Sequence, residues 1–286
     1  RGTPCAAIAA GAGRQCAELL KQARDAALVR ALCGFSSALA RHAAVAKRAQ
    51  LVEDGLLREI TAAFDVFASR REVLADCCLF IAILARGVPA MQEAVLACRL
   101  RDANTDSLDA ILVTMRRCGS LPRLQWCALQ SLLSLVSQPQ VRERLRQGPS
   151  ISVLRVSLEG TNQDTQCLEA FCLLLSELAA DRSYSYRIYD IPIADDQFAK
   201  LLKSQQLPLL LLFCLQAHLE KKDPYLCQCI LSAFAGISNS GPELNRQDLL
   251  SLVRRVDRSD VTPLLEKVVL EGMEICEAAP PPVHDA

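Results

Sequence analysis

Apolar positions along the chain follow the spacing of one helix face in five separate segments. In each segment a hydrophobic residue, which we call the anchor, is preceded by further apolar residues three, four and seven positions earlier. Of these fifteen preceding positions only two, Ser36 and Ser131, are not apolar. The residue after each anchor is small or β-branched, which would let a neighbouring helix approach closely. The anchors are Leu39, Leu84, Leu135, Leu178 and Ile237.

The intervals between successive anchors are 45, 51, 43 and 59 residues. A helical unit of about 40 to 47 residues exposes an apolar surface that only its neighbours can cover, so such units stack. Leu and Ala dominate, aromatic residues are only 5% of the chain, and alternating strand patterns are scarce. The pattern therefore predicts an all-α fold in which about five helical repeats stack on one another.

Residues 45–64, VAKRAQLVEDGLLREITAAF, carry the most specific family pattern. A basic stretch leads into Leu51-Val52-Glu53-Asp54-Gly55-Leu56-Leu57 and then into a second helix, and this resembles the armadillo repeat. The other repeats resemble the armadillo and the related HEAT pattern about equally. The resemblance implies a right-handed α-solenoid over residues 20–277, after an Ala/Gly-rich leader (1–19) and before a disordered Pro-rich tail (278–286).

Armadillo proteins commonly bind extended peptides in a groove lined by the third helix of each repeat, and nuclear-import adaptors line it with Trp and Asn ladders. The only tryptophan of this chain, Trp126, falls outside the expected register. The resemblance therefore disfavours an import adaptor. The positions that correspond to the Asn ladder are Ala38, Ile83, Ser134, Glu177 and Gly236. Those that correspond to the Trp ladder are Gly34, Leu79, Gln130, Leu173 and Ser232.

The longest interval, 59 residues, is 16 residues longer than the shortest one, and the excess lies at 181–198, DRSYSYRIYDIPIADDQF. This insertion lacks a helical period and holds three of the four tyrosines. Tyr and Arg are enriched at interface hot spots because they combine a large contact area with a polar tip. We interpret the insertion as a docking segment, and packing of these side chains back onto the repeats is the alternative. The predicted partner-binding residues are Tyr184, Tyr186, Arg187 and Tyr189.

Neither catalytic nor metal-binding patterns stand out. The chain has three histidines, no catalytic or phosphate-binding motif, and no cysteine pair at metal-ligand spacing. We therefore expect no enzyme, no metal, no cofactor and no small-molecule substrate. Most of the fourteen cysteines lie in apolar runs, where free cysteine packs as a small hydrophobe. They predict reduced thiols in an intracellular and most simply cytoplasmic protein, and no apolar run approaches the roughly 20 residues of a membrane span.

Charge is divided unevenly between the two halves. Residues 1–150 hold 20 basic against 13 acidic side chains, and residues 151–286 hold 12 against 19, although the whole chain is neutral. We expect a non-catalytic scaffold or adaptor that binds other proteins, as a structural subunit of a cytoskeletal, ciliary or organellar assembly. One alternative is a membrane-tethered trafficking adaptor with an acylation signal ahead of Arg1. The other is a nucleic-acid-associated factor that uses the basic half, which the absence of a basic stripe disfavours.

Overall fold

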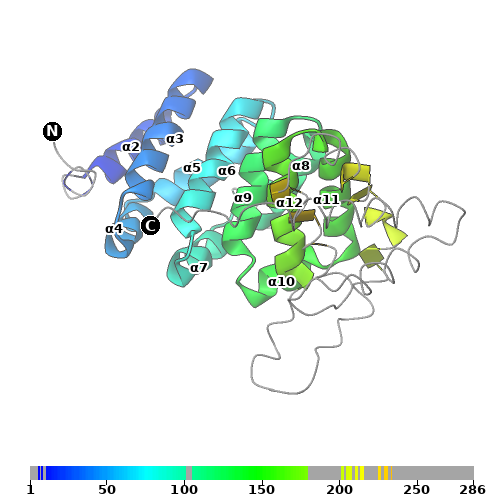
Figure 1. Ribbon diagram of the computed structural model, residues 1–286. Coiled ribbons are helices and arrows are strands. Elements are labelled where there is room, and N and C mark those ends of the chain that lie inside the picture. The colour runs from blue at the N-terminus through cyan, green and yellow to red at the C-terminus, as the bar shows by residue number, and fades with distance from the viewer. Residues whose placement is uncertain are drawn as a thin grey trace, which may run out of the picture. The chain divides into compact units, whose positions relative to one another are not determined.

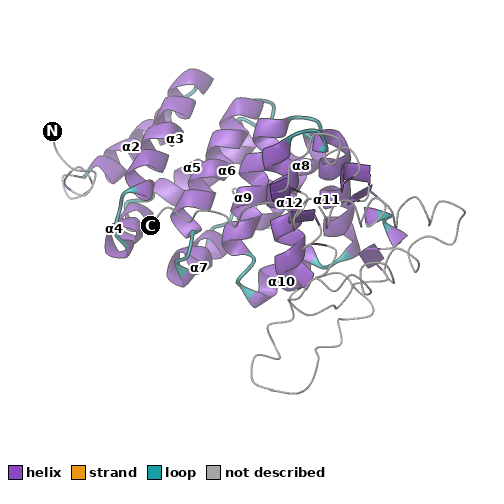
Figure 2. Cartoon of the chain, viewed as in Figure 1, coloured by secondary structure: helices purple, strands orange, loops and turns teal. Residues whose placement is uncertain are grey.

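The computed structural model describes residues 11–100 and 105–179, and single positions at 6, 8 and between 201 and 233. Every element of this part of the chain is an α-helix, and one isolated β-bridge joins Arg99 to Asp106 (Figure 2). The predicted all-α class is therefore confirmed for the described residues. Anchor Ile237, the insertion 181–198 and the tail 278–286 lie outside them. The helices are α2 (Ala12–Gln22), α3 (Ala26–Arg41), α4 (Val45–Glu53), α5 (Leu56–Val66), α6 (Arg71–Ala85), α7 (Pro89–Ala97), α8 (Ser107–Arg117), α9 (Pro122–Leu135), α10 (Pro139–Leu145), α11 (Gly148–Thr161) and α12 (Thr165–Ala179).

Helix length follows a repeating order of short, middle and long. Helices α4, α5 and α6 have 9, 11 and 15 residues, and α7, α8 and α9 have 9, 11 and 14. Helices α10, α11 and α12 have 7, 14 and 15 residues. The long helices are α3, α6, α9 and α12, and each anchor of the described chain lies near the carboxyl end of one of them.

The chain divides into two compact units, residues 1–144 and 145–286. In the first unit the long helices pack in succession, α3 against α6 and α6 against α9 (Figure 1). Helix α6 is the centre of this unit, because nearly all of its residues are buried. In the second unit α11 packs against α12. Packing between successive long helices is consistent with a helical repeat.

The predicted apolar face is the packing face of the long helices. Fourteen of the fifteen aligned positions fall on described residues, and all of them are buried except Phe35, which is 48% exposed. The small residues after the anchors are also buried, as close packing of a neighbouring helix requires. The buried anchors are Leu39, Leu84, Leu135 and Leu178, and the buried residues that follow them are Ala40, Ala85, Val136 and Ala179.

The two serines that interrupt the apolar pattern are buried without leaving a hydroxyl group unpaired. Ser36 Oγ donates to the Leu32 carbonyl oxygen at 2.7 Å. Ser131 Oγ lies 2.6 Å from the Cys78 carbonyl oxygen on α6 and 3.1 Å from that of Cys127 on its own helix. Since a buried hydroxyl group is costly only when it lacks a partner, these serines keep the packing face intact.

Local sequence explains several helix ends. The Asp25 carboxylate accepts a hydrogen bond from the Leu28 N–H at 2.9 Å, and the Asp106 carboxylate accepts one from the Asp109 N–H at 2.9 Å. These contacts satisfy N–H groups that the first turn of a helix leaves unpaired. Helices α7, α9 and α11 carry a proline in the first turn, where the missing N–H costs nothing. Gly55, with φ +84°, turns the chain between α4 and α5.

Helix α2 extends the packed structure into the segment that we interpret as a leader from the sequence. It begins at Ala12, and it packs against α5 and α3. Its residues Cys16, Ala17 and Leu20 are buried, and their spacing places them on one face of the helix. Residues 12–19 therefore contribute to the core of the first unit.

Candidate functional site

The four predicted partner-binding residues, Tyr184, Tyr186, Arg187 and Tyr189, lie outside the described residues. Their proposed role stays a prediction. The described chain offers a different surface, formed by the long helices of the first unit.

Helix α6 reaches this surface along one narrow strip. Between Val73 and Ala85, only Asp76, Leu79 and Ile83 are more than 2% exposed. Their spacing of three and four residues places them on one side of the helix. The rest of α6 is covered by its neighbours, so this strip is its contribution to the molecular surface.

Helices α9 and α3 carry strips of the same kind. Trp126, Gln130 and Ser134 follow each other at intervals of four residues on α9, and the first two are partly exposed. On α3, Arg30, Gly34 and Ala38 have the same spacing. We call the combined surface the long-helix face. Its residues are Arg30, Gly34, Ala38, Asp76, Leu79, Ile83, Arg86, Arg123, Trp126, Gln130 and Ser134.

Polar contacts join the three strips of the long-helix face. Asp76 Oδ2 accepts from Arg30 Nε of α3 at 3.1 Å, and Asp76 Oδ1 accepts from Arg123 Nη2 of α9 at 2.8 Å. Farther along, Arg86 Nη2 donates to Gln130 Oε1 at 3.1 Å. A single aspartate therefore links three successive long helices at one edge of the face. The face contains three arginines against this one aspartate and presents a net positive charge.

Along the strips of the long-helix face, apolar and small side chains lie between the polar residues. Leu79 and Trp126 are partly exposed, and Gly34 has no atom within 4 Å of the place where a Cβ would lie. Tryptophan and arginine are over-represented among residues that dominate binding energy at interfaces. The combination of partly exposed apolar side chains and neighbouring arginines is typical of a protein-binding surface.

The described ladder positions of the armadillo resemblance that lie on α3, α6 and α9 all belong to this face, although they hold neither Trp nor Asn. Trp126 was set aside by that register, yet it lies one turn before Gln130 on the same strip. Asp76 was also missed as a candidate. A signal was available, because Arg30, Asp76 and Arg123 follow one another at intervals of 46 and 47 residues, close to the repeat length.

Side chains of the short helices fix the carboxyl ends of the long helices. Arg48 Nη1 on α4 donates to the Ile83 carbonyl oxygen at 3.2 Å, and Gln92 Nε2 on α7 donates to the Ser134 carbonyl oxygen at 2.8 Å. Arg48 and Gln92 are each the fourth residue of their helix, and Ile83 and Ser134 each precede an anchor. The same contact therefore recurs in two successive repeats and holds the long-helix face in place.

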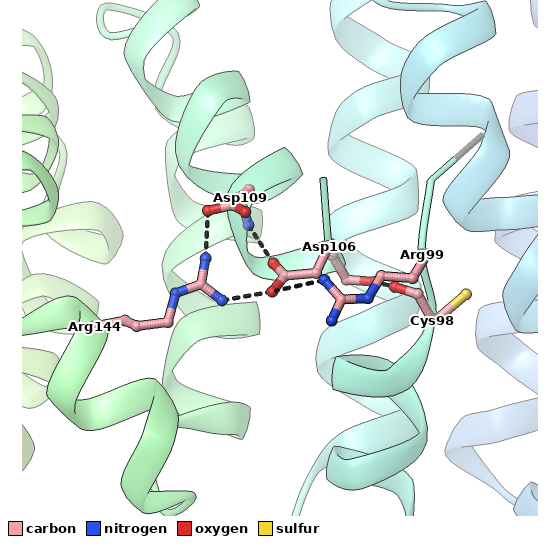
Figure 3. A network of polar contacts seen from close by, with 6 residues as sticks. Cys98, Arg99, Asp106, Asp109 and Arg144 are labelled. Carbon is pink, nitrogen blue, oxygen red and sulfur yellow. Dashed lines mark hydrogen bonds and ion pairs between the residues drawn. The ribbon is translucent and has the colours of Figure 1, made fainter. Parts of the chain in front are cut away.

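The connection between α7 and α8 is longer than its counterpart in the preceding repeat. It covers residues 98–106, whereas only residues 54–55 connect α4 and α5. Arg144 of α10 donates to Asp106 Oδ2 at 2.5 Å and also to Asp109, and Arg99 lies 3.9 Å from Asp106 (Figure 3). Burial raises the pKa of Asp106, but its hydrogen bonds with Arg144 and the Asp109 N–H outweigh burial and hold the pKa below its ordinary value. This network ties the longer connection to α8 and α10.

A groove of about 370 Å³ lies between α5 and α8, beside this connection. Phe64, Leu74 and neighbouring apolar residues line it, and Asp65 and Arg117 lie at its edges. The corresponding space between α2 and α5 measures only about 20 Å³. The groove can admit a large side chain, and the middle helices of these two repeats are therefore packed less closely than the long helices.

The described thiols are free and mostly buried. Cys33 Sγ and Cys77 Sγ are 4.0 Å apart between α3 and α6, and the hydrogen bond with Cys33 together with burial raises the pKa of Cys77. Burial raises the pKa of Cys127 to about 12. Cys77 and Cys127 are therefore protonated at neutral pH, and all three thiols are buried core residues. Among the described residues, no group of three His, Cys, Asp or Glu side chains can hold a metal ion.

In the second unit, the corresponding strip of α12 is acidic. Its least buried positions include Glu169, Leu173 and Glu177, with Leu173 44% exposed. Tyr225 Oη donates to Glu169 Oε1 at 2.8 Å, and this hydrogen bond raises the pKa of Tyr225. The strip of α12 in the second unit is thus acidic, whereas the long-helix face of the first unit is positively charged. This difference agrees with the charges of the two halves of the sequence.

Comparison of the sequence with protein-family models finds no match, and comparison with curated proteins finds no similar protein. None of the described helices has both the length and the apolar character needed to cross a bilayer.

Proposed function

We propose that this chain is a right-handed α-solenoid of about five armadillo-like repeats and that it binds other proteins without catalysis. The order of short, middle and long helices supports a three-helix repeat of the armadillo kind. In this proposal the chain is an intracellular scaffold or adaptor, a subunit of a larger assembly in a reducing compartment. The armadillo pattern of residues 45–64 corresponds to α4 and α5, which precede α6, a long helix of the long-helix face.

The long-helix face is the proposed docking surface for an extended segment of a partner protein. The observation that carries the proposal is the partly exposed pair Leu79 and Trp126 beside arginines that bridge successive helices. Its excess of arginine favours a segment that carries acidic side chains between apolar ones. The Asp76 bridges keep the surface ordered before binding, which lowers the entropic cost of association.

Affinity capture followed by mass spectrometry tests this proposal. Wild-type protein is compared with Trp126→Ala and Leu79→Glu, and Val113→Glu serves as the matched control because Val113 is exposed on α8. Treatment of the extract with nuclease removes partners that are held through nucleic acid. We expect the same partners to be lost with both face variants and retained with the control. An unchanged set of partners with both face variants would show that the proposal is wrong.

A further inference from the structure

The outer side of α3, away from α6, is exposed where the equivalent sides of α6 and α9 are buried. The comparison uses positions eleven, eight and four residues before each anchor. On α6 these residues are Val73, Asp76 and Phe80, at 0%, 8% and 0% exposure. On α9 they are Leu124, Cys127 and Ser131, at 2%, 1% and 0%. On α3 they are Leu28, Ala31 and Phe35, of which Leu28 is 43% and Phe35 48% exposed and Ala31 is also exposed.

Side-chain contacts show which neighbour covers these positions on α6 and α9. Asp76 of α6 binds both neighbours, Arg30 of α3 and Arg123 of α9. The next residue, Cys77, lies against Cys33 of the preceding long helix, α3. Ser131 of α9 donates to the Cys78 carbonyl oxygen of the preceding long helix, α6. The same register on α3 therefore faces the place where a preceding long helix would lie. In Figure 1, α3 stands at one end of the row that continues through α6 and α9.

The outer side of α3 is suited to a helix because its middle is wholly apolar. All exposed residues between Ala26 and Ala40 are apolar or small. Four of them follow intervals of four, three and four residues, the spacing that forms a seam between two helices. We call the six residues together the α3 outer face. They are Ala27, Leu28, Ala31, Gly34, Phe35 and Ala38.

The charges around the α3 outer face indicate which charged side chains the bound helix carries beside its apolar seam. Arg24 and Arg41 border it, and so does Arg30, which also binds Asp76 of α6. The nearby Asp25 carboxylate is engaged by the Leu28 N–H at the start of α3. Acidic side chains on an incoming helix would complement these arginines, whereas lysines would be repelled. Two copies of this chain packed through α3 would bring their own arginines together, which disfavours self-association.

We propose that the α3 outer face binds an amphipathic helix of a partner protein, with an apolar seam of small and large residues and acidic flanks. The bound helix takes against α3 the place that α3 itself takes against α6. This contact adds a second docking surface of different geometry, which shares only Gly34 and Ala38 with the long-helix face. Burial of Leu28 and Phe35 supplies the apolar part of the binding energy.

Two synthetic peptides of the length of α3 test the proposal against the full chain. Both carry the same Leu/Ala seam, one flanked by Glu and the other by Lys, and binding is followed by fluorescence anisotropy of a label on the peptide. We expect the Glu-flanked peptide to bind about tenfold more tightly than the Lys-flanked one. Phe35→Glu should abolish this binding, and Val113→Glu on α8 should preserve it.

The test also separates a loss of binding from a loss of folding. Because Phe35 is half exposed, Phe35→Glu should unfold at nearly the same temperature as the wild type, and circular dichroism checks this. Equal affinity for the two peptides, or undiminished binding by Phe35→Glu, would overturn the proposal. So would the absence of binding to either peptide. If the molecular mass of the wild-type protein in solution rises with protein concentration and Phe35→Glu abolishes this rise, the α3 outer face binds a second copy of the chain instead.

Discussion

The Gln92 side-chain amide lies 2.8 Å from the Ser134 carbonyl oxygen and fixes the end of α9 to α7. Its own oxygen, Oε1, accepts from Ser137 Oγ at 2.9 Å and from Gln138 Nε2 at 2.8 Å. Gln92 is only 4% exposed, so these partners take the place of water. One buried amide therefore secures the end of the strip that bears Trp126.

Gln92→Leu should destabilise the first unit by about 1 to 3 kcal/mol, because buried partners would then lose their hydrogen bonds. The measurement is the midpoint of urea unfolding. Glu93→Leu is the matched control, since Glu93 is the exposed neighbour of Gln92 on the same helix, and it should change stability by no more than about 0.5 kcal/mol. Equal effects of the two substitutions would contradict the structural role of Gln92.

Asp106 should stabilise the chain in a pH-dependent way. Its pKa in the folded protein lies below the ordinary value of 3.8, so its stabilising effect is present above that value and is lost as the pH falls through the folded pKa. We expect Asp106→Asn to lower the free energy of unfolding at pH 7 and to have a smaller effect at pH 3. Asp65→Asn, at an exposed carboxylate, is the control. A difference between wild type and Asp106→Asn that is the same at both pH values would show that the Arg144 contact does not set this pKa.

The cysteines should differ sharply in reactivity towards a maleimide at pH 8. Burial raises the pKa of Cys78 well above its ordinary value and that of Cys214 to about 12, and a protonated, buried thiol reacts slowly. Cys98, Cys118 and Cys229 are partly exposed and should be labelled before the buried thiols of the described chain. Peptide mapping by mass spectrometry identifies the labelled sites, and protein unfolded in guanidinium provides the reference in which all sites react. Labelling of Cys78 as fast as Cys98 would contradict the burial of this core.

Replacement of Tyr184, Tyr186 and Tyr189 by Ala tests the docking role that the sequence predicts for the insertion. Partner capture should weaken while the helical circular dichroism spectrum stays unchanged, because hot-spot tyrosines act at the interface. Arg187→Ala should add to the loss. A variant that loses its helical spectrum would favour the alternative in which these side chains pack onto the repeats.

Helical periodicity was sufficient to predict the packing faces of α3, α6, α9 and α12, including their anchors. The exposure of Phe35 could not be predicted, because the pattern shows which face is apolar but not whether a neighbour covers it. The apolar spacing of Cys16, Ala17 and Leu20 does indicate α2, but the Ala/Gly-rich composition of that segment obscured it.

The candidate site could be predicted from the sequence less completely than the fold. The armadillo resemblance indicates the ladder positions, and the residue types at these positions argue against Trp and Asn ladders. Neither the positions nor the residue types predict that Asp76 contacts Arg30 and Arg123. Those contacts depend on how far each long helix is shifted along its neighbour. The connection 98–106 lies within the interval of 51 residues and is longer than its counterpart 54–55, and the apolar pattern alone did not indicate this place.

Fluorescence of Trp126 tests the central claim most directly, because it is the only tryptophan of the chain and lies on the α9 strip of the long-helix face, between Arg123 and Gln130. The captured partner, or the segment of it that is protected on binding, is titrated into the wild-type protein and into Leu79→Glu. Binding over the face should remove water from the indole, shift its emission to shorter wavelength and saturate with the partner concentration, and Leu79→Glu should abolish the shift. A partner that binds fully while the Trp126 emission stays unchanged would contradict the account.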